Sequence, residues 1–177
     1  MVHDVEKTIL PGELVKILQD PESIKAVGTL NADGSPYVVI NYTLTTLDSK
    51  TLIFSEELEK SSSNKNMVQS IWFDKPVSVN VTQGGTSFNI QARPYLCLIA
   101  GKLFQEMLLR TRSVGGQDAD ISTVWILQPE KISNTSAGIL RHELESAHPY
   151  FGQHLDRASI KNDLPSDVPK NNPKALD

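Results

Sequence analysis

The first half of the chain alternates apolar and polar positions with the period of two that marks a half-buried strand. Runs rich in β-branched residues predict strands over residues 25–31, 37–46 and 51–55. Asp33-Gly34 separates the first two runs, and a short loop of this composition favours the positive φ angles of a tight hairpin turn. Three consecutive antiparallel strands are therefore expected before residue 56.

Apolar residues change to helical spacing at two places. Leu14, Ile17 and Leu18 share one face of a short predicted helix that begins at Pro11, a residue suited to the first helical turn. A second apolar face predicts a helix over residues 64–73. Both helices are short, and only the second stands between strand patterns, which indicates a fold that is mainly β.

The second half of the chain returns to strand patterns. Strands are predicted over residues 77–82, 95–104 and 122–127, and Pro129 is expected to end the last one. Residues 105–121 fit either a strand extension or a helix. At least six strands with one intervening helix favour a closed or nearly closed antiparallel barrel of the mainly β (α+β) class.

The chain length of 177 residues suits one domain with an appendage. We expect a barrel domain over residues 1–135 and a C-terminal extension over residues 136–177, which packs on the barrel or on a second copy of the chain. Residues 161–177 contain three prolines among Asn, Asp and Lys and have no apolar periodicity. This last segment is expected to be a tail.

Composition and charge narrow the expected partners. The formal net charge is −4, which argues against nucleic acid as a partner because neutralising its phosphates requires a basic excess. A small anionic ligand needs only a local positive site and remains possible. His142, His148 and His154 lack the i, i+4 spacing of a helical zinc pair, so no metal site is expected.

The chain shows no pattern that indicates export or membrane insertion. Its N-terminal residues lack the apolar region of a signal peptide, and no run of about 20 apolar residues occurs. Cys97 is the only cysteine, so no intramolecular disulfide forms, and its apolar neighbours predict a small buried residue. These observations predict a cytoplasmic protein without membrane contact.

One polar stretch carries the candidate chemistry. The residues ELEKSSSNKNMV, numbered 57–68, follow the third predicted strand and lead into the second predicted helix. Free backbone N–H groups at a helix start attract anions, and Ser61–Ser63 with Lys60 and Lys65 would add hydroxyl donors and positive charges. The same residues also suit a polar loop, because Ser and Asn are common N-caps. The stretch is therefore either a phosphate cradle or a solvated loop.

The order of motifs resembles the FMN-binding split β-barrel family, which includes pyridoxamine 5′-phosphate oxidase and small FMN-binding electron-transfer proteins. The resemblance covers residues from about Leu10 to Ser133. It rests on ILPG at 9–12, AVGTLNADGSPYVV at 26–39, LIFS at 52–55, FDKPVSV at 73–79 and LIAGK at 98–102. It implies a six-stranded antiparallel split β-barrel with Greek-key character and a few peripheral helices.

The resemblance implies a phosphate site after the third strand, where the family places a cluster of Lys, Ser, Thr and Asn beside the FMN phosphate. Two frames remain open in this chain. One frame uses Lys60 and Ser61 with Asn64. The other uses the helix start, with Ser61, Ser63, Asn64 and Lys65.

The resemblance also implies a flavin-ring site along the second strand, which follows the flavin edge in the family. Asn41, Tyr42 and Thr43 match that position, and Tyr42 either lies near the ring face or is a core residue. The full set of implied FMN-binding residues is Asn41, Tyr42, Thr43, Ser55, Lys60, Ser61, Ser63, Asn64 and Lys65.

The implied function is that of a flavoprotein that binds FMN noncovalently in a homodimer, with two sites formed where two barrels meet. Trp125 and the tail are candidates for that interface. The expected activity is an FMN-dependent oxidoreductase that uses NAD(P)H or a protein electron donor and a small-molecule acceptor, with no nominated catalytic side chain. Arg141-His142 is the only pair comparable to the substrate-phosphate residues of pyridoxamine phosphate oxidase and lies in no matching motif, so vitamin B6 oxidation is not expected.

Two alternatives to an oxidoreductase remain open. The first is a non-catalytic FMN-binding electron carrier or flavin-storage protein. The second is a flavin-free relative that binds haem or another anionic ligand. Glu56, Glu57 and Glu59 are expected to be a solvated charge run, but they would repel a phosphate if they faced it, and they keep the second alternative open.

Overall fold

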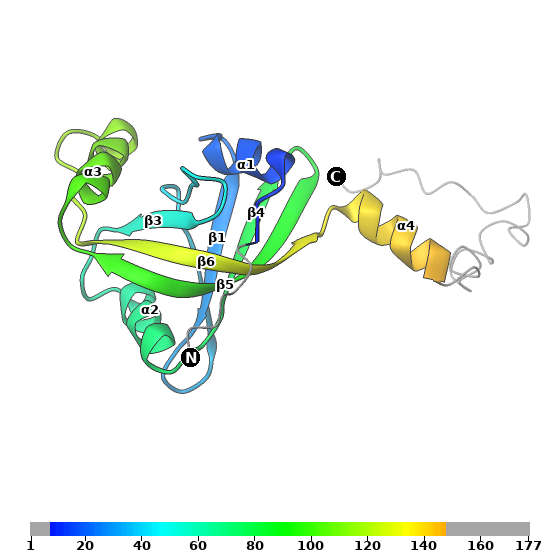
Figure 1. Ribbon diagram of the computed structural model, residues 1–177, viewed down its shortest axis with the longest axis horizontal. Helices are drawn as coiled ribbons and strands as arrows, with labels where there is room; N and C mark the ends of the chain where they lie inside the picture. Colours follow the sequence, from blue (N-terminus) through cyan, green and yellow to red (C-terminus); the bar gives the residue numbers. More distant parts are fainter. Residues whose placement is uncertain (1–7, 148–177) are drawn as a thin grey trace, which may run out of the picture. The chain divides into compact units, whose positions relative to one another are not determined.

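The computed structural model describes residues 8–147 and divides the chain into two units, Met1–Ala137 and Gly138–Asp177. The first unit holds the sheet (Figure 1), and the described part of the second unit, residues 138–147, belongs to helix α4, Ala137–Ala147. The predicted tail, His148 and His154 lie outside the described residues. Within residues 8–147, no helix is long and apolar enough to cross a membrane.

Six antiparallel strands form one curled sheet, which confirms the predicted fold class. Their order in the sheet is β2-β1-β4-β5-β6-β3. The strands are β1 (Ile24–Leu30), β2 (Pro36–Ile40), β3 (Leu52–Glu56), β4 (Val77–Gln83), β5 (Thr86–Leu98) and β6 (Thr123–Asn134). The predicted hairpin joins β1 to β2, and Gly34 has the positive φ, 84°, that its turn requires.

The segment after β2 joins the two ends of the sheet. The Asn41 N–H donates to the Lys25 carbonyl of β1 at 2.9 Å, and Thr45 exchanges two backbone hydrogen bonds of 2.8 Å with Ile53 of β3. Since β2 and β3 are the two edge strands, this crossing closes the barrel. The predicted strand over residues 37–46 therefore leaves the ladder at Ile40 and crosses to the opposite edge.

Alternating apolar residues fill the barrel interior. In β4, Val77, Val79 and Val81 are buried while the residues between them are not. Helix α1 (Gly12–Gln19) adds Leu14 and other residues of its predicted face to the same core. Trp125 is also part of this core and only 1% exposed, so the prediction that it lies at a dimer interface is wrong.

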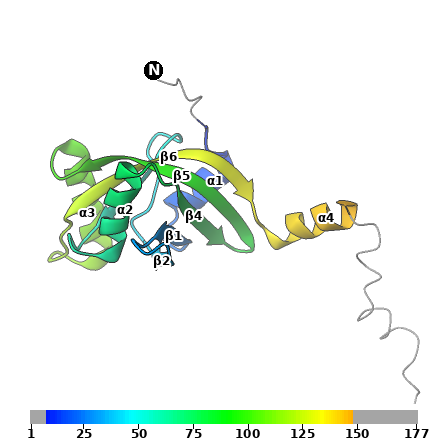
Figure 2. The same cartoon turned by 90° about the horizontal axis from the view of Figure 1, so that it is seen from below.

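Two helices flank the end of β3 at one end of the sheet, as Figures 1 and 2 show. Helix α2 (Ser62–Trp72) follows β3 and confirms the predicted helix, and α3 (Lys102–Gly115) follows β5. The predicted strand over residues 95–104 is wrong beyond Leu98. Gly101 has a φ of 103°, a conformation that favours glycine and lets the chain turn from the strand into α3.

Strand β6 runs through Pro129, so the prediction that this proline ends the strand is also wrong. Pro129 lies opposite Ala92, at a point where the register of β5 against β6 shifts. Such an irregularity tolerates a residue without an N–H, because the regular ladder is already interrupted. The sheet therefore continues past a residue that normally interrupts it.

Candidate functional site

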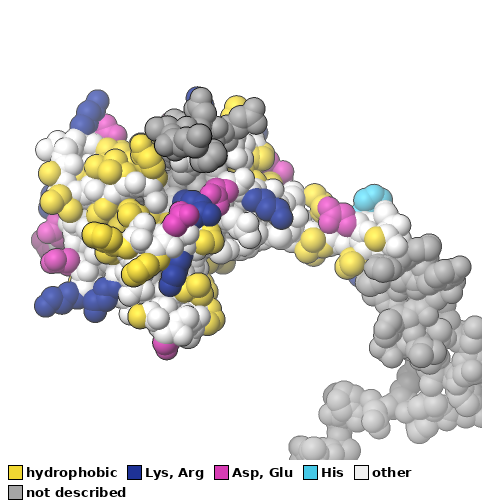
Figure 3. All heavy atoms as spheres, turned by 60° about the horizontal axis from the view of Figure 1, so that its bottom comes forward, with side chains coloured by type: hydrophobic (Ala, Val, Ile, Leu, Met, Phe, Trp, Pro, Cys, Tyr) yellow, Lys and Arg dark blue, Asp and Glu magenta, His cyan; other side chains and the backbone are white. Residues whose placement is uncertain are grey.

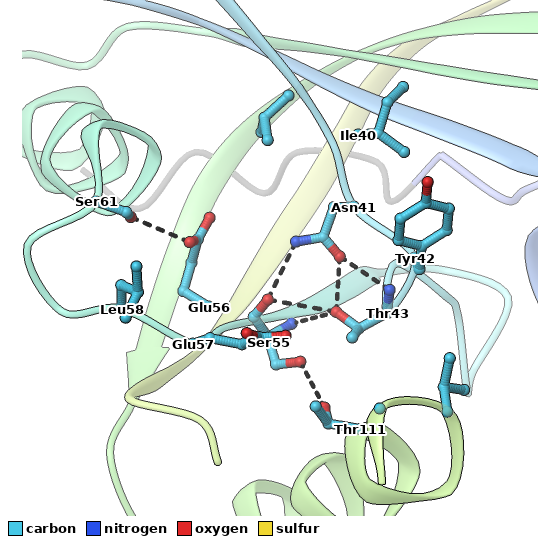
Figure 4. Close-up of a pocket in the computed structure, with 13 residues that line it drawn as sticks. Ile40, Asn41, Tyr42, Thr43, Ser55, Glu56, Glu57, Leu58, Ser61 and Thr111 are labelled. Carbon is cyan, nitrogen blue, oxygen red and sulfur yellow. Dashed lines mark hydrogen bonds between the residues drawn. The ribbon is translucent and has the colours of Figure 1, made fainter. Parts of the chain in front are cut away.

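A cavity of about 360 Å³ opens beside the segment that closes the barrel (Figure 4). Its walls come from Val39–Thr43, from Ser55–Leu58 at the end of β3, from Ser61, and from one face of α3. These segments are distant in sequence and meet only because residues 41–46 cross from β2 to β3. The volume lies in the range of small-molecule sites.

Side chains of the crossing segment form the frame of this cavity. The Asn41 Oδ1 accepts hydrogen bonds from the Thr43 N–H at 3.0 Å and from the Thr43 hydroxyl at 2.7 Å. The Asn41 Nδ2 donates to the Ser55 carbonyl at 3.1 Å, and the Ser55 N–H donates to the Thr43 hydroxyl at 2.8 Å. These contacts replace a regular strand ladder and hold the crossing segment against β3 (Figure 4).

A buried hydroxyl pair fixes α3 to the same strand. The Ser55 and Thr111 hydroxyl oxygens are 3.0 Å apart. The Thr111 hydroxyl donates its hydrogen to the Met107 carbonyl at 2.9 Å, so Ser55 is the donor in the contact between the two side chains. Ser55 therefore has a structural hydrogen bond in addition to its place in the cavity wall.

Tyr42 lies at the cavity with its side chain largely in solvent. It is 66% exposed, so the alternative of a core residue is wrong. Tyr42 also lines a neighbouring cavity of about 280 Å³, together with Gln19 and Arg110. An aromatic ring in this position offers a face on which a planar ligand can stack.

At the far side of the cavity, the start of α2 meets a buried carboxyl group. The Ser61 hydroxyl caps α2 by accepting the Asn64 N–H at 3.0 Å, and it donates to Glu56 Oε2 at 3.1 Å. Burial raises the pKa of Glu56 above its ordinary value, an effect opposed by hydrogen bonding from Ser63 and Ser61 and reinforced by the charge of Glu57. The cavity thus carries a carboxyl group where a phosphate is expected.

The other predicted phosphate ligands lie outside the cavity wall. Asn64 is buried, and its Oδ1 accepts hydrogen bonds from Trp125 at 2.8 Å and Thr123 at 3.2 Å. Ser63 is 2% exposed, and within the described chain its hydroxyl lacks a partner of good hydrogen-bond geometry. Lys60 and Lys65 are exposed. Of the nine predicted residues, five line the cavity: Asn41, Tyr42, Thr43, Ser55 and Ser61.

Sequence reasoning missed two parts of this cavity. Glu56 was expected in a solvated run, but it is only 8% exposed because it is the last residue of β3, all five residues of which are buried. The continuation of the strand pattern through Glu56 was the available signal. Thr111 and Val114 were missed because residues 105–121 fitted two structures, and only one of them, a helix, brings these side chains to the cavity.

Comparison with known proteins identifies the fold. No protein-family model matches the sequence, and no curated protein matches it. Solved structures do match: HupZ of Group A Streptococcus has a TM-score of 0.57 at 14% identity, over 73% of this chain and 96% of that one. An FMN-binding protein from Syntrophomonas wolfei has a TM-score of 0.55 at 11% identity, over 63% of this chain and 76% of that one.

A proposed pyridoxamine 5′-phosphate oxidase from Lactobacillus delbrueckii is also similar, with a TM-score of 0.55 at 18% identity, over 71% of this chain and 93% of that one. This chain therefore has the split-barrel fold of the FMN-binding and pyridoxamine 5′-phosphate oxidase-like proteins, as its motif order indicates.

Proposed function

We propose that this split-barrel protein binds FMN noncovalently in the cavity beside residues 41–43 and acts as a flavin-dependent oxidoreductase. The observation that supports this most is the position of the cavity. It lies at the end of the second strand and the end of the third, the two places where the family resemblance puts the flavin ring and the FMN phosphate. Five of the nine residues implied by the resemblance line it.

The residues present fit a flavin in most respects. Tyr42 offers an exposed aromatic face, and the frame of Asn41, Thr43 and Ser55 gives the ring a rigid wall. Ser61 and the start of α2 are the nearest groups for a phosphate, with Lys60 and Lys65 as exposed cations. When bound, FMN would supply the redox chemistry, while these side chains orient it.

We propose further that the protein works as a homodimer, as the resemblance implies. The lower face of Figure 1, which is turned forward in Figure 3, displays many hydrophobic side chains. Around the end of α2, Ile71 is 42%, Trp72 79% and Phe73 68% exposed. Large exposed apolar side chains gathered on one face are typical of protein interfaces, which supports a second copy as their cover. Sedimentation of the purified chain tests this part of the proposal.

Two variants on one helix test the flavin site. Val114 of α3 lines the cavity and is 70% exposed, whereas Leu109 of the same helix is 66% exposed and lies outside the cavity wall. Val114→Trp should fill part of the cavity and weaken FMN binding at least about tenfold, measured by quenching of flavin fluorescence. Leu109→Trp, the matched control, should leave the affinity unchanged.

The first test is whether the protein is a flavoprotein at all. It uses the visible absorption spectrum of the purified protein before and after addition of FMN. The two visible bands of an oxidised flavin support the proposal, and a colourless protein that ignores FMN would contradict it. Oxidation of NAD(P)H faster than with free FMN would support an oxidoreductase. FMN binding without such turnover would instead favour the electron carrier or storage protein.

A further inference from the structure

Glu56 is held rigidly at the wall of the cavity. It is the last residue of β3 and pairs with Thr123 of β6. Its carbonyl accepts the Ser122 N–H at 2.7 Å and the Ser122 hydroxyl at 3.0 Å. Its carboxyl group points toward the cavity and accepts the Ser61 hydroxyl, as Figure 4 shows. The backbone contacts fix the main chain of Glu56, while its 8% exposure and the hydrogen bond from Ser61 hold the carboxyl group at the cavity.

The Glu56 carboxyl group accepts the hydrogen bond that the Ser61 hydroxyl would otherwise donate to a phosphate. The Ser61 hydroxyl has one hydrogen and donates it to Glu56, while its oxygen accepts the Asn64 N–H. The Ser63 hydroxyl is buried, and it lowers the pKa of the same carboxyl group, although within the described chain it has no partner of good hydrogen-bond geometry. A charged Glu56 therefore leaves Ser61 without a hydrogen for a second anion.

The surroundings of Glu56 do not balance its charge. Residue Glu57 of its own strand end adds a second negative charge. The serines of α2, Thr111 of α3, Thr123 of β6 and Asn41 of the crossing segment are all uncharged. Lys60 and Lys65 are exposed, and within residues 8–147 no cation is among the groups that shift the pKa of Glu56.

From this arrangement we infer that Glu56 determines whether the cavity accepts a phosphate ester. With Glu56 ionised, the cavity favours a flavin that ends in a neutral hydroxyl group; with Glu56 protonated, it accepts the phosphate of FMN. This inference rests on the proposed flavin-binding function. Burial, which raises the pKa of this carboxyl group, brings its protonation closer to neutral pH.

The chemistry of the two states differs in both charge and hydrogen bonding. An ionised carboxylate accepts hydrogen bonds only and repels a phosphate at close range. It can still accept a hydrogen bond from the terminal hydroxyl of riboflavin. A protonated carboxyl group has a hydrogen to donate to a phosphate oxygen and releases the Ser61 hydroxyl to do the same. FMN binding should therefore be coupled to proton uptake by Glu56.

The experiment compares FMN and riboflavin with the full chain between about pH 5 and about pH 8, a range that lies above the ordinary pKa of a glutamate, so that an exposed carboxyl group stays ionised throughout. Fluorescence quenching gives both dissociation constants, and their ratio expresses the preference for the phosphate. In the wild type the preference for FMN should fall at least about tenfold as the pH rises. In Glu56→Gln the preference for FMN should not fall as the pH rises. At the upper pH this preference should exceed that of the wild type at least about tenfold.

Glu57→Gln is the matched control, since it removes one exposed carboxylate beside the same cavity. Because the charge of Glu57 adds to the raised pKa of Glu56, this variant should keep the fall in the preference for FMN, with the midpoint moved to lower pH. The phosphate of FMN has its own second ionisation near about pH 6, but this ionisation is common to all three proteins and cancels in the comparison. If Glu56→Gln failed to fold, the pH profile of the wild type would still test the inference. A preference for FMN that stayed constant or rose with pH would overturn it.

Failure of the inference and failure of the proposed function give different results. Flavin binding with the same pH profile in the wild type and in Glu56→Gln would overturn the inference and leave the flavin site standing. Binding of neither flavin, by any of the three proteins at any pH in the range, would overturn both. A pH-dependent preference that disappears only in Glu56→Gln would support both.

Discussion

The indole N–H of Trp125 donates a hydrogen bond of 2.8 Å to the side-chain oxygen of Asn64. Both residues are buried, so this contact ties the start of α2 to β6 across the core. The Asn64 Nδ2 also donates to the Glu59 carbonyl at 2.8 Å, which holds the preceding loop. Asn64 therefore has a structural role in addition to the ligand role that the family resemblance implies.

Asn64→Ala should destabilise the protein. The substitution leaves the Trp125 N–H and the Thr123 hydroxyl buried without their partner, and a lost buried hydrogen bond of this kind costs about 1–3 kcal/mol. Urea unfolding measures the change. Lys65→Ala, at the exposed next position, is the control and should stay within about 0.5 kcal/mol of the wild type. Unchanged stability with lost FMN binding would instead identify Asn64 as a ligand.

Single substitutions of the two lysines separate the two phosphate frames. Lys60→Ala should weaken FMN binding at least about tenfold if the frame of Lys60, Ser61 and Asn64 applies, because a charge-assisted contact is lost. Lys65→Ala should have that effect if the helix-start frame applies. Titration with FMN gives the affinity, and riboflavin, which has no phosphate, should bind both variants as it binds the wild type. Unchanged FMN affinity in both variants would contradict a phosphate site at residues 60–65.

Removal of the Glu56 charge should stabilise the protein at alkaline pH. The pKa of Glu56 is raised above its ordinary value of 4.5 by burial, so the folded state holds this proton more tightly than the unfolded state. The wild type therefore loses stability as the pH rises from 4.5 through the folded-state pKa. Glu56→Gln lacks this loss, so its Tm should exceed that of the wild type near about pH 8, and the difference should shrink below the ordinary carboxyl pKa. A Tm difference between the two proteins that is equal at both pH values would contradict a raised pKa for Glu56.

Lys25→Met should raise the stability of the barrel. The Lys25 side chain is 1% exposed, and its Nζ donates to the Asp20 carbonyl at 2.9 Å. Burial lowers the pKa of Lys25, and the charge of Arg110 lowers it further, so the folded state disfavours the ammonium form at neutral pH. Replacing such a buried charge with an apolar residue of similar size should add about 1 kcal/mol.

Thermal unfolding checks the Lys25→Met prediction, with a rise in Tm of about 2–4 °C for a chain of this length. The gain should decline as the pH rises toward 10.5, the ordinary lysine pKa, because the wild type then loses less by burying this group. Lys50→Met replaces an exposed lysine and should leave Tm nearly unchanged. A lower Tm for Lys25→Met would mean that its hydrogen bond outweighs the burial of its charge.

The sequence by itself determined those elements whose evidence is local. The hairpin around Gly34, the short helix with Leu14 and the helix over residues 64–73 are all present, because their turn residues and apolar periods act within a few positions of the chain. The strand pattern predicted an antiparallel barrel, and the resemblance of the motif order to the FMN-binding family implied the split barrel. The same resemblance implied a ligand site at Asn41, Tyr42 and Thr43, which line the cavity.

Only the tertiary structure decided what each ambiguous or polar residue does. Residues 102–115 form a helix because Gly101 turns the chain, and Pro129 stays in β6 because the opposite strand shifts its register there. Glu56 is buried because β3 extends to it, and Asn64 bonds Trp125 rather than lining the cavity. These outcomes depend on contacts between segments that are far apart in sequence. The apolar periodicity of a single segment does not predict such contacts.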